Sequence, residues 1–312
     1  MKVKKIEIGS TLGIMCPSSK FNEPKTLEIF LEYLTKKGFK YKLGKSMNES
    51  YGYLAGSDEV RADDLNGFFK DDDVDAILCF RGGYGFARFL NEIDYELISK
   101  KPKLLIGFSD VTALLNAIYK KTKVIGLHGE MGIRMKKEYL ENDFYSFKNM
   151  IDTMLGVAPS NLLEGFENAV SFKNNSIIKG EIVGGNLSLV ASLMGTPYEI
   201  DTKDKILLLE DVDEVPYTID RYLCTLRLAN KLKDAKALVI GYFTRCDKEP
   251  TSTNQSIKDV LEEYTKDLDC QVVYNFPTGH DQPFVNVPLG VPVEINPISK
   301  SVIVLESLFL DK

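Results

Sequence analysis

The sequence predicts an α/β fold, with an N-terminal doubly wound parallel-sheet domain and a C-terminal β-rich domain that resembles a small barrel. Two observations favour this fold. In the first half, strand segments of consecutive apolar residues alternate with amphipathic helix segments, which is typical of a parallel sheet covered on both faces. In the second half, strand segments outnumber helices. We therefore place the α/β domain at 1–150, a polar linker at 151–175 and the β-rich domain at 176–312.

The N-terminal domain begins with two strand–helix units. An apolar strand over 11–17 precedes a helix over 23–38, whose apolar residues fall on one face and which ends at Gly38. A weaker strand over 40–45 precedes a helix over 57–69, which carries acidic residues in its first turn, where they favour the helix dipole.

Three further strands continue this pattern. They cover residues 74–80, 103–108 and 123–129, with helices over 86–93 and 110–121 between them. The strand over 74–80 runs into the glycine-rich turn RGGYG. The repeated order predicts one parallel sheet with helices on both faces.

The pattern changes after about residue 140. Residues 138–155 favour a helix, and residues 156–176 are polar and loop-like. Helices are then expected over 186–195 and 219–232. The strand segments of this half cover residues 176–185, 205–211, 236–243, 270–276, 291–295 and 301–306. The last two strands flank a short turn and predict a hairpin.

Composition and charge exclude several classes of function. The net charge is −6 and no basic block stands out, so a nucleic-acid partner is not expected. No signal peptide or membrane span is visible, and we expect a soluble, cytoplasmic protein without a membrane partner. Five scattered cysteines without a CxxC pair favour reduced thiols over disulfides or a zinc site. Any histidine chemistry must use His128 or His280, because the sequence holds two histidines.

Ser109 stands where the strand over 103–108 meets the next helix, in the stretch GFSDV. Ligands bind beyond the carboxyl ends of strands in open α/β sheets, and a tight turn there would expose the hydroxyl as in a nucleophile elbow. The second glycine of the G-x-S-x-G motif is missing, however. Taken alone, the stretch favours an ordinary N-cap serine with Asp110 in the first helical turn, and the nucleophile is the alternative.

A nucleophilic serine needs a base and a carboxylate that orients the base. His280 lies in a Pro- and Gly-rich loop directly after the strand over 270–276, whereas His128 fits a partly buried, hydrogen-bonded histidine. Glu210 follows four apolar residues at the end of a strand, which makes it the favoured orienting carboxylate. Asp211 is a rival, although it begins an acidic run that suggests a solvated segment.

Two glycine pairs follow strand segments, where backbone amides can point at an anion. The pair at 82–83 suggests an oxyanion hole, in which the amide of Gly83 assists that of Asp110. The pair at 184–185 precedes a helix with Asn186 at its N-cap. Either pair also fits a turn that only requires positive φ.

Together these elements resemble the LD-carboxypeptidase family of serine peptidases, which also includes the microcin C immunity peptidases. The resemblance covers nearly the whole chain in order. It rests on the blocks GIMCPSS, YLAGSDEVRADDLNGFFKDDDVDAILCFRGGYGFARFL, GFSDVTAL, GGNLSLVASLMGTPYEID, LLLEDVDEVPYTIDR and PTGHDQPFVNVPLG. One stretch departs from the family pattern: HGE at 128–130 stands where many members have His-Gly-Pro, which puts the shape of this loop in doubt.

The resemblance implies a catalytic triad in the chain order Ser–Glu–His. Ser109 would be the nucleophile, Glu210 the orienting carboxylate and His280 the general base. The amides of Gly83 and Asp110 would form the oxyanion hole. The resemblance implies no metal and no cofactor, and it suggests a homodimer.

A small peptide is the substrate that the resemblance implies. A carboxypeptidase also binds the terminal carboxylate of its substrate, for which arginine is the best partner. The candidates for substrate binding are Arg81, Gly82, Tyr84, Asn186 and Arg221. Arg134 is a further candidate for binding the terminal carboxylate.

Three functions remain open at this point. The first is release of the terminal D-Ala from cytoplasmic murein tetrapeptides, as part of peptidoglycan recycling. The second is a microcin-immunity-like peptidase that cleaves aminoacyl-nucleotide amides; since such members stack aromatic residues on the nucleobase and this chain has no Trp, the first is favoured. The third is a non-catalytic α/β protein whose glycine turns hold an anionic ligand.

Overall fold

The computed structural model describes residues 1–141, 144–247 and 255–310. These residues form two compact units. Unit 1 contains Met1–Ala158, Asn286–Pro288 and Ser307–Lys312, and unit 2 contains Pro159–Val285 and Leu289–Glu306. The chain therefore returns to unit 1 twice after it has entered unit 2.

Unit 1 is built on a six-stranded sheet in the order β11-β5-β4-β3-β1-β2. The strands are β1 (Thr11–Met15), β2 (Lys40–Leu43), β3 (Ala76–Cys79), β4 (Leu104–Gly107), β5 (Gly126–His128) and β11 (Val287–Leu289). The pairs β1–β2, β1–β3, β3–β4 and β4–β5 are parallel. This arrangement confirms the predicted doubly wound sheet.

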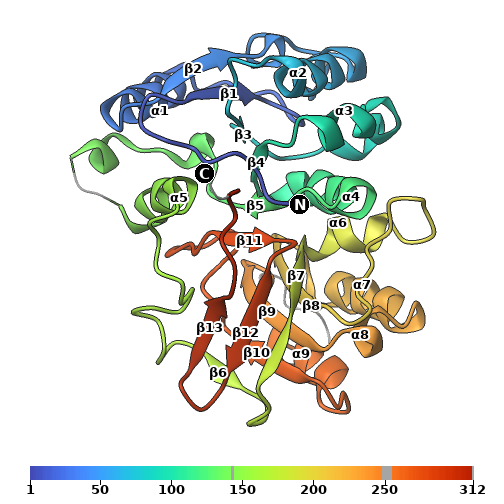
Figure 1. Cartoon of the computed structure of the whole chain (residues 1–312). Coiled ribbons are helices and arrows are strands. Elements are labelled where there is room, and N and C mark those ends of the chain that lie inside the picture. Colours follow the sequence, from blue (N-terminus) through green and yellow to red (C-terminus); the bar gives the residue numbers. More distant parts are fainter. Residues whose placement is uncertain (142–143, 248–254, 311–312) are drawn as a thin grey trace. The chain divides into compact units, whose positions relative to one another are not determined.

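Helices cover both faces of this sheet, as Figure 1 shows: α1 and α5 lie on one side, and α2, α3 and α4 lie on the other. They are α1 (Pro24–Lys36), α2 (Asp58–Lys70), α3 (Tyr95–Lys100), α4 (Thr112–Thr122) and α5 (Tyr145–Leu155). Strands β3 and β4 are buried at every residue, which explains their unbroken apolar sequences. The edge strand β2 is largely exposed, which explains its weaker, lysine-containing pattern.

Unit 2 is built on a curled, mixed sheet of seven strands in the order β13-β12-β7-β8-β9-β10-β6. The strands are β6 (Ser171–Phe172), β7 (Ile178–Asn186), β8 (Ile206–Val212), β9 (Ala237–Thr244), β10 (Gln271–Tyr274), β12 (Pro292–Asn296) and β13 (Ser301–Val304). Strands β7 to β10 run parallel, and β12 and β13 form the antiparallel hairpin that the sequence predicts. The helices are α6 (Leu187–Ser192), α7 (Pro216–Leu228), α8 (Lys231–Asp234) and α9 (Ile257–Thr265).

Several elements differ from the sequence-based expectation, and the short strands β6 and β11 are among those not predicted. Residues Phe86–Glu92 form a 3₁₀ helix with a non-helical residue at Phe89, instead of a regular α-helix. The rings of Phe86 and Phe89 are both buried, with centroids 4.5 Å apart, so core packing decides the local conformation. Helix α9 was not predicted, although Ser256 and Asp259 form a capping box at its start.

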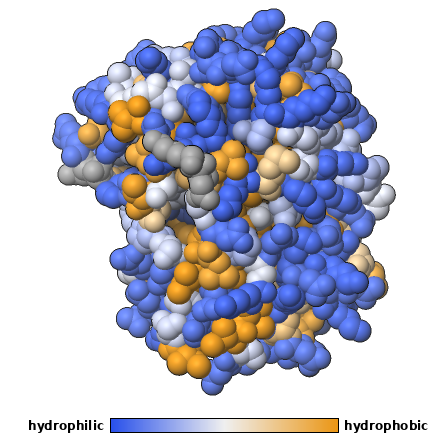
Figure 2. Space-filling view, viewed as in Figure 1, coloured by the Kyte–Doolittle hydropathy of each residue, from blue (hydrophilic) through white to orange (hydrophobic). Residues whose placement is uncertain are grey.

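The visible surface is mainly hydrophilic, and its hydrophobic side chains form separate small groups, as Figure 2 shows. Large apolar side chains with high exposure, such as Ile8, Leu228 and Ile298, lie far apart in the sequence. Within the described residues, the helices are too short or too polar to cross a membrane.

Candidate active site

Ser109 occupies a tight turn between β4 and α4 in unit 1. A short 3₁₀ turn, Ser109–Val111, precedes α4, and the N-cap residue of α4 is Val111. Ser109 is therefore not the N-cap serine that the local sequence favours. Its φ of 61° lies in the left-handed region, which is unfavourable for a residue with a Cβ. Strained backbone of this kind is a property of the nucleophile elbow.

The glycine pair at 82–83 lies directly against this turn. A Cβ at Gly82 would stand 3.2 Å from the Cβ of Ser109 and 3.4 Å from the amide nitrogen of Asp110. Gly83 adopts a φ of 107°, which favours glycine. Among the hydrogen bonds of the described residues, none uses the amide of Gly83 or Asp110 as its donor. Both amides can therefore serve a bound anion.

Ser19 fixes the start of the same glycine turn. Its amide donates to the carbonyl oxygen of Gly82 at 3.2 Å, and its hydroxyl accepts from the amide of Tyr84 at 3.1 Å. Any side chain at Gly83 would collide with the Ser19 hydroxyl. The Pro-Ser end of β1 thus shapes the turn that carries Gly83.

Glu210 and His280 form a hydrogen-bonded pair in unit 2. Glu210 lies in β8 near its carboxyl end and has no exposed surface. Its Oε2 is 2.7 Å from Nδ1 of His280, whose side chain remains 17% exposed. A carboxylate at Nδ1 leaves Nε2 as the ring nitrogen that can exchange a proton with a nucleophile.

Two glycines allow this close approach, and sequence reasoning missed both roles. Gly279 precedes His280 with a φ of 123°, and a Cβ there would lie 2.9 Å from Oε2 of Glu210. A Cβ at Gly241 would lie 3.2 Å from the Cβ of Glu210 and 2.7 Å from the carbonyl oxygen of Thr278. The TGH tripeptide was the available signal for Gly279, whereas nothing in the local sequence marks Gly241.

Asp211, the rival carboxylate, binds other partners. It accepts hydrogen bonds from Nδ2 of Asn186 at 3.0 Å and from the amide of Ser188 at 2.9 Å. It is only 2% exposed, so its expected place in a solvated run is wrong. Burial, together with the nearby charge of Glu210, raises the pKa of Asp211 to about 7.

The candidate substrate-binding arginines differ in their surroundings. Nη1 of Arg81 lies 4.0 Å from Glu23, and the guanidinium of Arg221 lies over the ring of Tyr217 at 5.5 Å. Arg134 lies over the ring of Phe108, the residue before Ser109, at 5.4 Å. Arg134 therefore contacts the residue before Ser109, and Arg81 directly precedes Gly82, which lies against the serine turn.

The glutamate of the unusual HGE stretch, Glu130, lies buried in unit 1. Glu130 has no exposed surface, and its Oε1 lies 3.4 Å from Nε of Arg134. The Glu130 amide donates to Oδ1 of Asn286 at 2.7 Å. His128 is also fully buried, with its ring edge-on to that of Phe108, and so lies deeper than the partly buried position that the sequence suggested.

The remaining candidates have contrasting environments. Tyr84 is 55% exposed, and its ring centroid lies 5.8 Å from that of Tyr53, which is also exposed. Asn186 is buried at the N-cap of α6, where its side chain accepts from the amide of Leu189 and donates to Asp211. Tyr84 is thus available to a ligand, whereas the Asn186 amide already holds Asp211.

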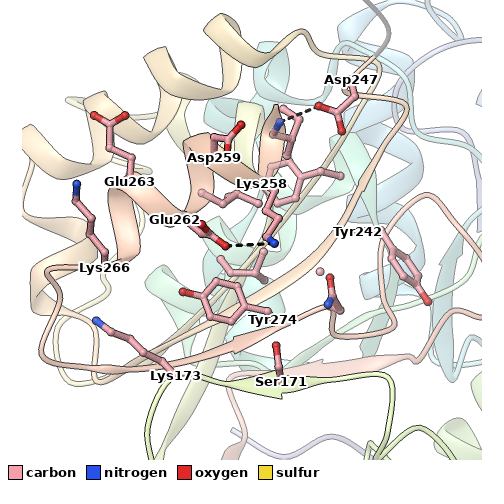
Figure 3. A pocket seen from close by; sticks show the side chains of 16 residues that line it. Ser171, Lys173, Tyr242, Asp247, Lys258, Asp259, Glu262, Glu263, Lys266 and Tyr274 are labelled. Carbon is pink, nitrogen blue, oxygen red and sulfur yellow. Dashed lines mark hydrogen bonds and ion pairs between the residues drawn. The ribbon is translucent and has the colours of Figure 1, made fainter. Parts of the chain in front are cut away.

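A separate hollow of about 1050 Å³ lies in unit 2, between α9 and the carboxyl ends of β9 and β10. Figure 3 shows Lys258 and Glu262 of α9 pointing toward one another on one wall of the hollow, with Tyr274 close by. Acidic and basic side chains both line the hollow, and Lys173 donates to the carbonyl oxygens that end α9. The Lys258–Glu262 pair and the Lys173 hydrogen bond account for part of this charge without a ligand.

Comparisons with known proteins address both units. Residues 12–129 match the family model described as the LD-carboxypeptidase N-terminal domain, and residues 179–295 match that of the LD-carboxypeptidase C-terminal domain. A relative from Bacillus subtilis (strain 168), named "Probable murein peptide carboxypeptidase", is 34% identical over 97% of this chain and 94% of its own length.

Two further similarities concern another activity. The "Microcin C7 self-immunity protein MccF" of Escherichia coli is 26% identical over 96% of this chain and 94% of its own length. The solved structure of MccF in complex with glutamyl sulfamoyl guanosine covers 99% of both chains with a TM-score of 0.87 at 22% identity. This last similarity is one of fold.

Proposed function

This chain belongs to the LD-carboxypeptidase family and is an enzyme of the serine carboxypeptidase class, and from this premise we propose that it releases the terminal D-Ala of murein tetrapeptides. The observation that carries the proposal is the 2.7 Å bond between the buried Glu210 and His280 in unit 2. The left-handed backbone of Ser109 in unit 1 supports it. The similarity to the murein peptide relative supports the choice of substrate.

The proposed reaction uses Ser109, His280 and Glu210 as a triad. Nε2 of His280 takes the proton of the Ser109 hydroxyl while Oγ attacks the carbonyl carbon of the last peptide bond. Glu210 holds the imidazole by Nδ1 and stabilises the imidazolium that forms. His280 then gives its proton to the leaving amine of D-Ala, and the peptide remains bound to Ser109 as an ester.

Water completes the cycle. His280 removes a proton from water, which attacks the ester carbonyl. The bond to Oγ of Ser109 then breaks, His280 returns the proton to Oγ, and the shortened peptide is released as its carboxylic acid. The amides of Gly83 and Asp110 stabilise the negative charge on the carbonyl oxygen in both steps, with each donor worth about 3 kcal/mol of barrier. Among the arginines, Arg81, Arg134 and Arg221 are the candidates for binding the terminal carboxylate.

Mass spectrometry of the reaction products tests this function. The purified chain is incubated with murein tetrapeptide and, separately, with a processed microcin C analogue. We expect loss of one alanine mass from the tetrapeptide and no loss with Ser109→Ala. An intact tetrapeptide together with cleavage of the analogue would overturn the proposed substrate and leave the triad in place.

The second candidate is therefore a microcin-immunity-like peptidase acting on aminoacyl-nucleotide amides. The specific observation in its favour is the exposed pair Tyr53 and Tyr84, since a nucleobase can stack on tyrosine. A non-catalytic binding protein is the third, and labelling of Ser109 by a fluorophosphonate would exclude it. The expected homodimer and cytoplasmic location remain predictions, which light scattering and cell fractionation would check.

A further inference from the structure

Two buried charges of opposite sign hold the same peptide group in unit 1. Nη1 of Arg61 donates to the carbonyl oxygen of Gly85 at 2.8 Å. The amide of Phe86 donates to Oδ2 of Asp110, also at 2.8 Å. This carbonyl and this N–H belong to the single peptide group that joins Gly85 to Phe86. The guanidinium binds one end of the group, and the carboxylate binds the other.

The same two side chains also hold the loop that follows β1. Nη1 of Arg61 donates to the carbonyl oxygen of Pro17 at 2.8 Å, and the hydroxyl of Ser18 donates to Oδ2 of Asp110 at 2.5 Å. Each charge therefore binds one group in the loop after β1 and one group in the glycine turn after β3. We call Arg61, Asp110 and the Gly85–Phe86 peptide group the peptide clamp.

Both charges of the clamp are buried, so the loss of either one would cost stability. Arg61 has no exposed surface and Asp110 is 2% exposed. Burial lowers the pKa of Arg61 and raises that of Asp110, and each charge partly opposes the shift of the other. Removal of one charge leaves the other buried with less compensation, which is the costly case for buried ions. Arg61 also pairs with Asp58, and its guanidinium lies 4.9 Å over the ring of Phe89.

The clamp closes the turn that carries Gly83, one of the two proposed oxyanion donors. Ser19 fixes the turn at Gly82 and Tyr84, and the clamp fixes its end at Gly85 and Phe86. Gly83 lies between these two anchors. On the other side, the Asp110 carboxylate belongs to the residue whose own amide faces Gly82. The clamp therefore ties the two proposed donor amides to each other.

We propose that Arg61 and the Asp110 carboxylate are positioning residues for the oxyanion hole, so that Asp110 takes part through its side chain as well as its amide. The proposal rests on the proposed function, because that function assigns the hole its role. Every substitution at 110 except proline keeps the backbone N–H, so the contribution of the side chain can be measured separately.

The test measures the rate at which a fluorophosphonate labels Ser109, together with kcat and KM for murein tetrapeptide. The variants are Asp110→Ala, Asp110→Asn and Ser18→Ala. The matched control is Asp75→Ala, because Asp75 also accepts a backbone amide, that of Thr11, but at the opposite end of β1. Circular dichroism and urea unfolding show which variants are folded under the assay conditions.

Asp110→Ala should slow labelling and lower kcat about 100-fold to 1000-fold, the range found when an oxyanion donor is lost, with KM changed less than about threefold. Asp110→Asn should retain activity within about tenfold, since its carbonyl oxygen can still accept from Ser18 and Phe86. Ser18→Ala should have an intermediate effect, and it stands in for Asp110→Ala if that variant does not fold. Asp75→Ala should label at the wild-type rate.

Folded Asp110→Ala and Ser18→Ala variants that label at the wild-type rate would overturn the positioning role, as would equal slowing by Asp75→Ala. A wild-type chain that is neither labelled nor active would instead refute the proposed function. In that case, amide hydrogen exchange at Gly83 and Tyr84 tests whether the clamp holds the glycine turn in place. Faster exchange in Ser18→Ala than in Asp75→Ala supports the clamp, and equal exchange overturns it.

Discussion

Oε2 of Glu210 lies 2.7 Å from Nδ1 of His280, and the carboxylate is held there without any exposed surface. A buried carboxylate with a histidine partner orients the ring and stabilises its charged form. The bond fixes the orientation of the His280 ring within unit 2, and the first prediction concerns this bond.

Glu210→Gln should lower kcat by about 10²-fold to 10⁴-fold, because the neutral amide can hold the wrong tautomer of His280. Stopped assays with murein tetrapeptide measure the effect. The matched control is Glu294→Gln, since Glu294 on β12 pairs with the exposed Lys179 on β7. A Glu210→Gln enzyme with wild-type kcat would remove Glu210 from the triad.

The free energy of unfolding, measured with urea, should be about 1 kcal/mol higher for Ser109→Gly than for Ser109→Ala. Glycine adopts the left-handed backbone of this residue without strain. Both variants lack the hydroxyl and should be inactive. Ser99, within α3, provides the control. There the order should reverse, since glycine is worse than alanine inside a helix. Equal stability of the two Ser109 variants would show that the backbone of Ser109 is not strained.

Gly279→Ala should reduce both activity and stability, the latter by about 1–3 kcal/mol, because the new Cβ meets Oε2 of Glu210 in a positive-φ backbone. Gly165→Ala is the control, since Gly165 also has positive φ but no neighbour within 4 Å of its Cβ position. Unfolding curves and kcat measurements compare the two. If Gly165→Ala lowers kcat as much, the contact with Glu210 is not the cause.

Asp211 should make the folded chain less stable as pH rises from about 4 to about 7. Its pKa rises from 3.8 in the unfolded chain to about 7 in the folded one, so the folded state holds a proton that the unfolded state has lost. The contribution to stability is complete below pH 3.8 and disappears as pH passes 7. Asp211→Asn should flatten this part of the stability curve measured by urea unfolding. An unchanged slope would show that Asp211 is ionised in the folded chain.

The sequence predicted the parts of the fold that depend on unbroken patterns. Strands β3 and β4 are buried at every residue and were visible as apolar runs, so the parallel sheet followed from them. The family was also recognisable, because its blocks occur in order along the chain. The triad remains a prediction, for which the pair in unit 2 gives geometric support.

Other features depend on contacts that no local pattern encodes. Asp211 looked solvated because it begins an acidic run, but the pairing of β8 with β9 shifts register between Leu209 and Asp211, and the side chain is buried. Ser109 looked like an N-cap, because serine before a helix usually is one. The glycines around it, and the charges of Arg61 and Asp110, show their effect only once distant segments lie together.

The order in which the chain visits its two units has a consequence for biosynthesis. Strand β11 joins the first sheet only after the Pro159–Val285 segment of unit 2 has been translated, and Asn286 then binds Asn149, Ser146 and Glu130. Near the C-terminus, Phe309 bridges to Val3. A nascent chain that stops at residue 158 therefore lacks an edge strand and these ties, and the contacts of unit 1 are complete only once the chain has reached Phe309. Separately expressed halves would be incomplete for the same reason.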